Sequence, residues 1–455
     1  MGTPLGRRTF GWMMFDWATQ PFFTLVLTFV FGPYLAATAA GLYAAEGLPE
    51  EAARAEAQAL WSRTQAAAGL AIAVTAPLLG ALADGAGRRV RWVAVLSVPY
   101  VLATAGLWIL TPDGGGLLAA LVLFGVAMVA AEFATVLTNA MLPGLQGGDR
   151  ARMGRVSGTG YALGYAGGVL SLLVVLALLA ETEEGRTLAG LPPILGLDPE
   201  AREGTRATGP FVALWYALFM VPFFALVRDP PAPAAIPGRA LPDLRRALVS
   251  AWRRPSLRAY LISSMLYRDA LAALYAFGGT YAVLVLDWPV TQVGVFGVIG
   301  AVTAALASWL GGRLDGRHGP RPVIAGCVAV LALASAAIAA TSRDAVLLVP
   351  VAPGSAGPDL ALYVAGSVIG GAGGALQAAS RTMMARHAEP DRPAEAFGLY
   401  AFSGKATAFL APALVALVTE ATGSARAGAV PVALLFLLGL ALLARVRPEG
   451  DLAAR

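Results

Sequence analysis

Long apolar runs recur twelve times along this chain of 455 residues, with shorter polar gaps between them. A helix needs roughly 20 mostly apolar residues to cross the hydrocarbon core of a bilayer, and only helices or closed barrels satisfy their backbone there. We therefore predict an all-α membrane protein with twelve transmembrane helices. The predicted spans are 10–39, 64–83, 92–111, 117–141, 156–180, 210–227, 259–286, 290–310, 323–341, 359–380, 396–419 and 428–445.

Arginines are concentrated in alternate gaps between these runs. When the N-terminus is placed in the cytoplasm, most of the 33 Lys and Arg residues fall in cytoplasmic gaps. This is the positive-inside bias, so both termini are predicted to be cytoplasmic. The net charge of +5 then reflects topology, and no nucleic-acid partner is expected.

The composition agrees with a chain embedded in lipid. Hydrophobic residues make up 57% and charged residues 13% of the chain, against about 25% charged residues in a soluble domain. A single Lys and a single Asn stand against 32 Arg, a bias typical of GC-rich bacterial genomes, and we therefore expect the bacterial inner membrane. The only cysteine, Cys327, lies in the ninth run, so no disulfide framework is expected.

The longest predicted cytoplasmic gap, 228–258, is rich in proline and arginine. Proline interrupts a helix, so this segment is predicted to link an N-terminal six-helix bundle, 1–227, to a C-terminal one, 259–455. Its basic, partly amphipathic end, 244–258, is expected to lie on the anionic leaflet. The gaps after the second and eighth runs share one pattern, which supports two repeated halves of the kind found in transporters.

That pattern predicts a cytoplasmic gate. The residues are Gly80, Asp84, Gly87, Arg88 and Arg89 in the first copy, with Asp315 at the position of Asp84 in the second. Glycine permits a tight turn and close helix contact, and an aspartate can pair with arginine or cap a helix. An ordinary turn with topogenic arginines is the alternative. The first copy resembles the signature loop of the major facilitator superfamily, which helps to lock the cytoplasmic side in the outward-facing state.

Charged and polar side chains inside the apolar runs are the candidates for substrate binding or proton coupling. A charge at a helix centre costs roughly 2.5–3.5 kcal/mol, so such groups normally face a cavity or a partner. Acids in such places can carry protons or bind amines, and cations can bind carboxylates. A structural ion-pair network is the alternative. The candidates are Asp16, Gln20, Glu132, Arg268, Asp269, Gln377 and Lys405.

No motif for catalysis is recognisable in the chain. No Walker loop, HExxH pair or nucleophile elbow occurs in a plausible structural context. The two histidines, His318 and His387, lie in predicted cytoplasmic gaps without ligand-spaced partners, so both are expected to be solvated. We expect a protein that is not an enzyme and that uses no cofactor and no metal.

Several longer segments resemble one branch of the major facilitator superfamily, the bacterial unknown-major-facilitator proteins and the autophagy-linked vacuolar amino-acid effluxers. Matching stretches are FDWATQPFFTLVLTFVFGPY, LTNAMLPGL, GRVSGTGYALGYAGG, YRDALAALYAFGGTYA and GGALQAASRTMMARHAEPDRPAEAFGLYAFSGKATAFLAP. The resemblance implies two six-helix bundles around a central cavity. Its fungal members imply amino-acid export.

These observations predict a secondary active transporter that moves a small polar metabolite by alternating access. An amino acid or related zwitterion is the expected substrate, with proton coupling left open. A drug or lipophile exporter of the same fold is one alternative, motivated by the glycine-rich fifth run. A non-transporting membrane receptor or scaffold is another. The expected partners are a small-molecule substrate and the lipid bilayer, and the chain is expected to be a monomer.

Overall fold

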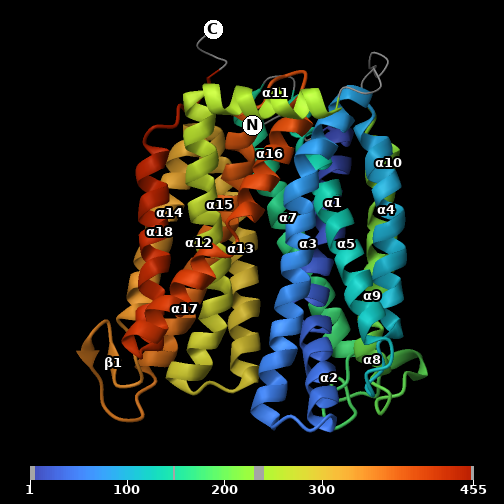
Figure 1. The fold of residues 1–455 in the computed structure, drawn as a ribbon, viewed down its shortest axis with the longest axis vertical. Coiled ribbons are helices and arrows are strands. Elements are labelled where there is room, and N and C mark those ends of the chain that lie inside the picture. The colour runs from blue at the N-terminus through green and yellow to red at the C-terminus, as the bar shows by residue number, and fades with distance from the viewer. Residues whose placement is uncertain (1–5, 147–148, 230–239, 452–455) are drawn as a thin grey trace. The chain divides into compact units, whose positions relative to one another are not determined.

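A computed structural model describes residues 6–146, 149–229 and 240–451. This part of the chain is almost entirely helical (Figure 1). Its only sheet is a hairpin of β1 (Ala345–Val346) and β2 (Val349–Pro350). The predicted all-α class is confirmed.

Eleven helical segments within the described residues are long and apolar enough to cross a membrane. The chain is therefore a multi-pass membrane protein. The seventh predicted span forms helix α12 (Pro255–Leu286), which is not among the eleven and contains side chains outside the described part. The count of twelve and the cytoplasmic placement of both termini stay predictions.

The chain forms two compact units. Unit 1 contains 1–75, 87–138 and 163–233, and unit 2 contains 76–86, 139–162 and 234–455. Helices α3, α5 and α7 therefore contribute to both units. The division into bundles 1–227 and 259–455 with a linker 228–258 stays a prediction, and residues 230–239 of that linker lie outside the described residues.

The first half of the chain supplies α1 (Arg7–Pro21), the π-helix η1 (Phe22–Phe29), α2 (Phe31–Ala45), α3 (Glu50–Ala86), α4 (Arg89–Gly106), η2 (Leu107–Ile109), α5 (Leu117–Asn139), α6 (Leu142–Leu145), α7 (Arg150–Leu178), η3 (Ile194–Gly196), α8 (Glu203–Arg206), α9 (Thr208–Phe219) and α10 (Val221–Leu226). The second half supplies α11 (Ala240–Arg253), α12, α13 (Val290–His318), α14 (Pro320–Ala339), α15 (Gly357–His387), α16 (Pro393–Ala406), α17 (Leu410–Thr422), η4 (Ala425–Gly428) and α18 (Ala429–Leu443).

Proline interrupts the first predicted span. Pro21 has no N–H group, so the carbonyl of Trp17, four residues earlier, cannot receive its helical hydrogen bond. The indole of Trp215 donates to that carbonyl instead, at 3.2 Å. The helix then continues as the π-helix η1 and leaves helical geometry at Val30, three residues before Pro33.

The eleventh predicted span is likewise two helices rather than one. Helix α16 ends at Ala406 and α17 begins at Leu410, so residues 407–409 form a break. Pro412 accounts for it, because a proline ring crowds the carbonyl four residues earlier, here that of Ala408. The break creates a second helix start within one span, with backbone N–H groups available to a partner.

Buried aromatic rings surround η1 in unit 1. Phe22 is fully buried, and its ring centroid lies 5.6 Å from that of Tyr100 and 5.9 Å from that of Phe124. Trp61 packs on Phe124 at 4.4 Å. Aromatic pairs at these distances add to the energy of close packing, which helps to hold the irregular helix in place.

Candidate functional site

The seven predicted substrate or coupling residues are divided between the two units. Asp16, Gln20 and Glu132 lie in unit 1, on α1 and α5, and Arg268, Asp269, Gln377 and Lys405 lie in unit 2, on α12, α15 and α16. All are at least partly buried. Each group is described within its own unit.

In unit 1, Asp16 and Gln20 lie on α1 immediately before the π-helix. Helix α7 approaches α1 closely here, because a Cβ atom on Gly164 would contact Asp16 and one on Gly168 would contact Gln20. The glycines of the fifth predicted span thus serve helix packing. Glu132 is partly buried in α5.

In unit 2, Arg268 of α12 reaches the end of α16. Its guanidinium donates a hydrogen bond of 2.9 Å to the carbonyl of Tyr400 and lies 4.1 Å from the centre of that ring. It also lies against Gly404, where a Cβ atom would overlap it. The guanidinium is therefore held beside the residue that precedes Lys405.

Asp269, the next residue of α12, is directed at the start of α17. Its side chain is buried, and Oδ2 accepts a hydrogen bond of 3.0 Å from the backbone N–H of Ala411. The N-terminal end of a helix carries about half a positive charge, which stabilises a carboxylate there. Among the described residues, the other oxygen, Oδ1, has no hydrogen-bond partner.

Lys405 lies in the last turn of α16, where the negative end of a helix favours a cation. Arg268 and Asp269 thus contact the two sides of the break between α16 and α17, and Lys405 lies two residues before that break. Gln377 lies on α15, partly buried. The arrangement places charges of both signs next to an interrupted membrane helix, the kind of element that transporters use for binding sites.

The first copy of the predicted gate motif contacts the start of α16. Asp84 accepts hydrogen bonds from the backbone N–H groups of Ala394, at 3.2 Å, and Glu395, at 2.7 Å. Gly80 lies so close to α16 that a Cβ atom would overlap the carbonyl of Ala394. The aspartate therefore caps a helix far away in sequence, and the glycine allows the approach.

The remaining residues of this motif lie in the following turn and in unit 1. Gly87 has a φ of +63°, a left-handed conformation that glycine adopts without strain. Arg88 precedes α4 and is exposed, and Arg89 is the first residue of α4.

The second copy is built differently. Asp315, near the end of α13, is almost fully buried and lies against Gly154 of α7. The nearest cation is Arg386, with Nη2 3.9 Å from Oδ1. Within the described residues neither carboxylate oxygen accepts a hydrogen bond from a backbone N–H group, so Asp315 caps no helix there.

Arg381 is a buried residue that is not among the site residues predicted from the sequence. It lies on α15, 2% exposed, and donates to Ser157 Oγ at 2.9 Å, to the Ser157 carbonyl at 2.8 Å and to Asn139 Oδ1 at 3.2 Å. Its guanidinium lies 4.3 Å from the centre of the Tyr161 ring. In the sequence, Arg381 directly follows a run of small residues, where α7 can approach closely, and this position was the available signal that its side chain is buried.

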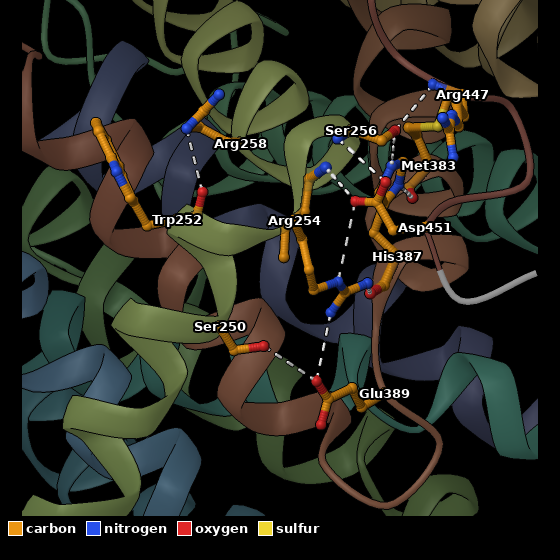
Figure 2. Close-up of polar contacts among 11 residues, drawn as sticks. Ser250, Trp252, Arg254, Ser256, Arg258, Met383, His387, Glu389, Arg447 and Asp451 are labelled. Carbon is orange, nitrogen blue, oxygen red and sulfur yellow. Dashed lines mark hydrogen bonds and ion pairs between the residues drawn. The ribbon is translucent and has the colours of Figure 1, made fainter. Parts of the chain in front are cut away.

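The two histidines differ in their burial. His318 is exposed as predicted, but His387 is fully buried, so its prediction as a solvated residue was wrong. Its ring stacks on Tyr260 at 5.4 Å and its Nε2 lies 2.9 Å from Ser256 Oγ (Figure 2). The end of the chain covers this place, because Asp451 accepts hydrogen bonds from the N–H groups of Ser256 and Leu257.

Across the part of the chain that the structure describes, no group of three or more His, Cys, Asp or Glu side chains could hold a metal ion.

Comparison with known proteins identifies the family. Residues 6–450 match the family model described as vacuole effluxer Atg22 like. The chain belongs to this family. A Bacillus subtilis protein named as an uncharacterized MFS-type transporter, YxiO, is 24% identical over 96% of this chain and 94% of its own length. Autophagy-related protein 22 of Cryptococcus neoformans (strain JEC21) is 24% identical over 65% of this chain. The matched region covers 50% of that relative's own length.

Solved structures agree on the fold. The human organic anion transporter MFSD10 matches with a TM-score of 0.66 and 17% identity, over 97% of this chain and 100% of its own. The proton:xylose symporter XylE matches with a TM-score of 0.69 and 10% identity, over 98% of both chains. The Atg22-like chain therefore has the major facilitator fold, and it is a transporter rather than an enzyme, as the resemblance implied.

Proposed function

We propose that this Atg22-like protein is a secondary active transporter that carries an amino acid or a related zwitterion by alternating access. The observation that carries the proposal is that Arg268 and Asp269 contact the two sides of the break between α16 and α17, with Lys405 in the last turn before it. A zwitterion presents a carboxylate and an ammonium group together. This site offers partners of both signs within one unit.

Each charge has a distinct role in the proposal. Arg268 and Lys405 bind the substrate carboxylate, and the planar guanidinium suits two parallel hydrogen bonds to it. Asp269 uses one oxygen to cap α17 and keeps Oδ1 for an ammonium group or a proton. Gln377 is proposed to add to the polar lining in unit 2, and Asp16, Gln20 and Glu132 of unit 1 are proposed as further substrate-binding or proton-coupling residues.

The contact between Asp84 and α16 is proposed to act as the gate. Two backbone hydrogen bonds and the close approach at Gly80 hold the end of α3 against the start of α16. Alternating access then requires that these bonds break when this side opens. We place this side and both termini in the cytoplasm and the protein, as a monomer, in the bacterial plasma membrane.

The family supports an exporter, because its description names a vacuole effluxer. The test is exchange of radiolabelled amino acids in proteoliposomes at two pH values, with a panel of acidic, basic and neutral amino acids and of lipophilic dyes. Exchange of one amino-acid class, lost in Arg268→Gln, is the expected result. Transport of dyes alone would favour the drug exporter instead, and binding without any transport would favour a receptor.

A further inference from the structure

Helix α11 forms one wall of a pocket in unit 2 that the transport proposal does not use. The pocket has a volume of about 500 Å³. We call it the arginine pocket. Its lining residues are Pro242, Arg245, Arg246, Val249, Ser250, Arg253, Arg254, Glu389 and Asp451.

Positive charge exceeds negative charge in this lining. Among the described lining residues four arginines face two carboxylates, which leaves a difference of 4 − 2 = +2. Arg254 is the cation that the acids neutralise, because its guanidinium lies 3.5 Å from Glu389 and 4.0 Å from Asp451 (Figure 2). The excess is therefore contributed by the arginines of α11.

Two of those arginines lack an anionic partner. Arg246 pairs with Glu395 at 3.1 Å. Arg245 and Arg253 are exposed, and among the described residues no ion pair or hydrogen bond engages either side chain. They are eight residues apart, so Arg245, Val249 and Arg253 follow one face of α11. Two cations on one wall of a pocket, without an ion-pair partner among the described residues, favour the binding of an anion there.

The rest of α11 has the character of a helix that lies at a membrane surface. Leu248 is 48% and Trp252 68% exposed, on a face next to the arginines. Helix α11 runs crosswise to α12 (Figure 1). An amphipathic helix with basic and apolar faces lies in the plane of the interface, where phosphate groups are concentrated.

We propose that the arginine pocket binds a phosphate-bearing anion. The planar guanidinium group matches phosphate with two parallel hydrogen bonds, which makes arginine a preferred phosphate ligand. Ser250 adds a hydroxyl to the lining. A volume of about 500 Å³ falls within the range of small-molecule sites, roughly 300–1,000 Å³. The phosphate belongs to an anionic phospholipid headgroup or to a soluble phosphate compound, and the experiment separates the two.

The experiment is a calorimetric titration of the full-length protein in detergent with three probes. These are a short-chain phosphatidylglycerol, a short-chain phosphatidylcholine and inorganic pyrophosphate. We expect the double variant Arg245→Gln with Arg253→Gln to weaken anion binding by about tenfold or more, because each lost guanidinium removes charge-assisted hydrogen bonds. The matched control, Arg317→Gln with Arg445→Gln, removes the same charge from two other exposed arginines and is expected to keep binding within about twofold.

Each outcome decides the proposal. Binding of phosphatidylglycerol alone supports a lipid headgroup, and equal or tighter binding of pyrophosphate supports a soluble anion, provided that the pocket variant loses it. Absence of binding by both anions overturns the proposal. Equal losses of binding in the two double variants also overturn the proposal, because they indicate general charge attraction. Binding of phosphatidylcholine as tight as that of phosphatidylglycerol overturns it as well. The unliganded melting temperature of the pocket variant checks that it is folded.

Discussion

Two aspartates of unit 2 approach the two helix starts of the eleventh predicted span and use their oxygens differently. At the start of α16, Asp84 accepts two backbone hydrogen bonds, one on each oxygen. At the start of α17, Asp269 accepts one, and its Oδ1 is left without a partner among the described residues.

The difference separates a structural carboxylate from one with capacity for chemistry. Asp84 accepts its two backbone hydrogen bonds with its two carboxylate oxygens. An asparagine side chain, which is neutral and has one acceptor oxygen, would keep one of these bonds. Asp269 is buried and has one oxygen without a hydrogen-bond partner among the described residues, so its charge and its spare oxygen matter together. Substitution by asparagine should therefore affect the two positions in opposite ways.

The largest effect is expected for Asp269→Asn. The asparagine carbonyl can still accept the N–H of Ala411, so the melting temperature should stay close to that of the wild type. Transport should fall by about tenfold or more, because a hydrogen bond to a charged group is worth roughly 1.5–3 kcal/mol. The remaining transport should lose its pH dependence. Exchange in proteoliposomes at two pH values measures both.

Asp269→Ala is the control, since it removes the cap as well as the charge. It should lower the melting temperature and transport together. If the Asp269→Asn variant transported at the wild-type rate and with unchanged pH dependence, Asp269 would neither carry a proton nor bind an amine.

A smaller effect, on stability, is expected for Gly80→Ala. The added Cβ atom would overlap the backbone carbonyl of Ala394, and backbone cannot move aside easily. Overpacking of this kind costs about 1–3 kcal/mol, so the free energy of unfolding should fall by that amount. Gly85→Ala, on the same helix with open space around it, is the matched control and should be neutral or slightly stabilising. Equal results for both variants would contradict the close approach.

Next in size is Asp84→Ala, which should lower the free energy of unfolding by about 1 kcal/mol through loss of the cap on α16. Asp84→Asn should cost less than the alanine variant and should keep transport. Denaturant titration compares the two variants, and proteoliposomes test transport. If Asp84→Asn lost transport while its stability was unchanged, Asp84 would be needed for its charge, as is proposed for Asp269, and the two aspartates would not differ in role.

The smallest effect is expected for Asp451→Ala. This residue caps α12 through the N–H groups of Ser256 and Leu257, so its loss should cost about 0.5–1 kcal/mol. Asp391→Ala, at an exposed turn, is the control and should change stability little. A cost at Asp451 no larger than that at Asp391 would show that the cap contributes nothing measurable.

Hydropathy alone predicted the class of the fold, because a span must be both long and apolar. It could not predict where helices break inside a span, since residues 396–419 read as one apolar run. Pro412 was the available signal, but a proline in a membrane helix is often tolerated without a break. The helices also extend past the runs, as in α3, which begins at Glu50 rather than near 64.

The site was predictable as a set of residues but not as a set of contacts. An ionisable side chain in an apolar run is visible in sequence, which is how Arg268, Asp269 and Lys405 were found. Arg268 and Asp269 bond to backbone groups that nearly any residue could supply, the carbonyl of Tyr400 and the N–H of Ala411. Asp84 and the N–H group of Ala394 that donates to it are separated by 310 residues, so no local pattern specifies the pair.

The cap on α12 has a consequence for the order in which the chain is made. Asp451 follows its partner Ser256 by 195 residues. Ribosomes add about 5–20 residues per second, so the start of α12 waits about 10–40 s for the carboxylate that completes it. Until then its first turn depends on water or lipid headgroups, and this corner of unit 2 reaches its final form only after residue 451 has been made.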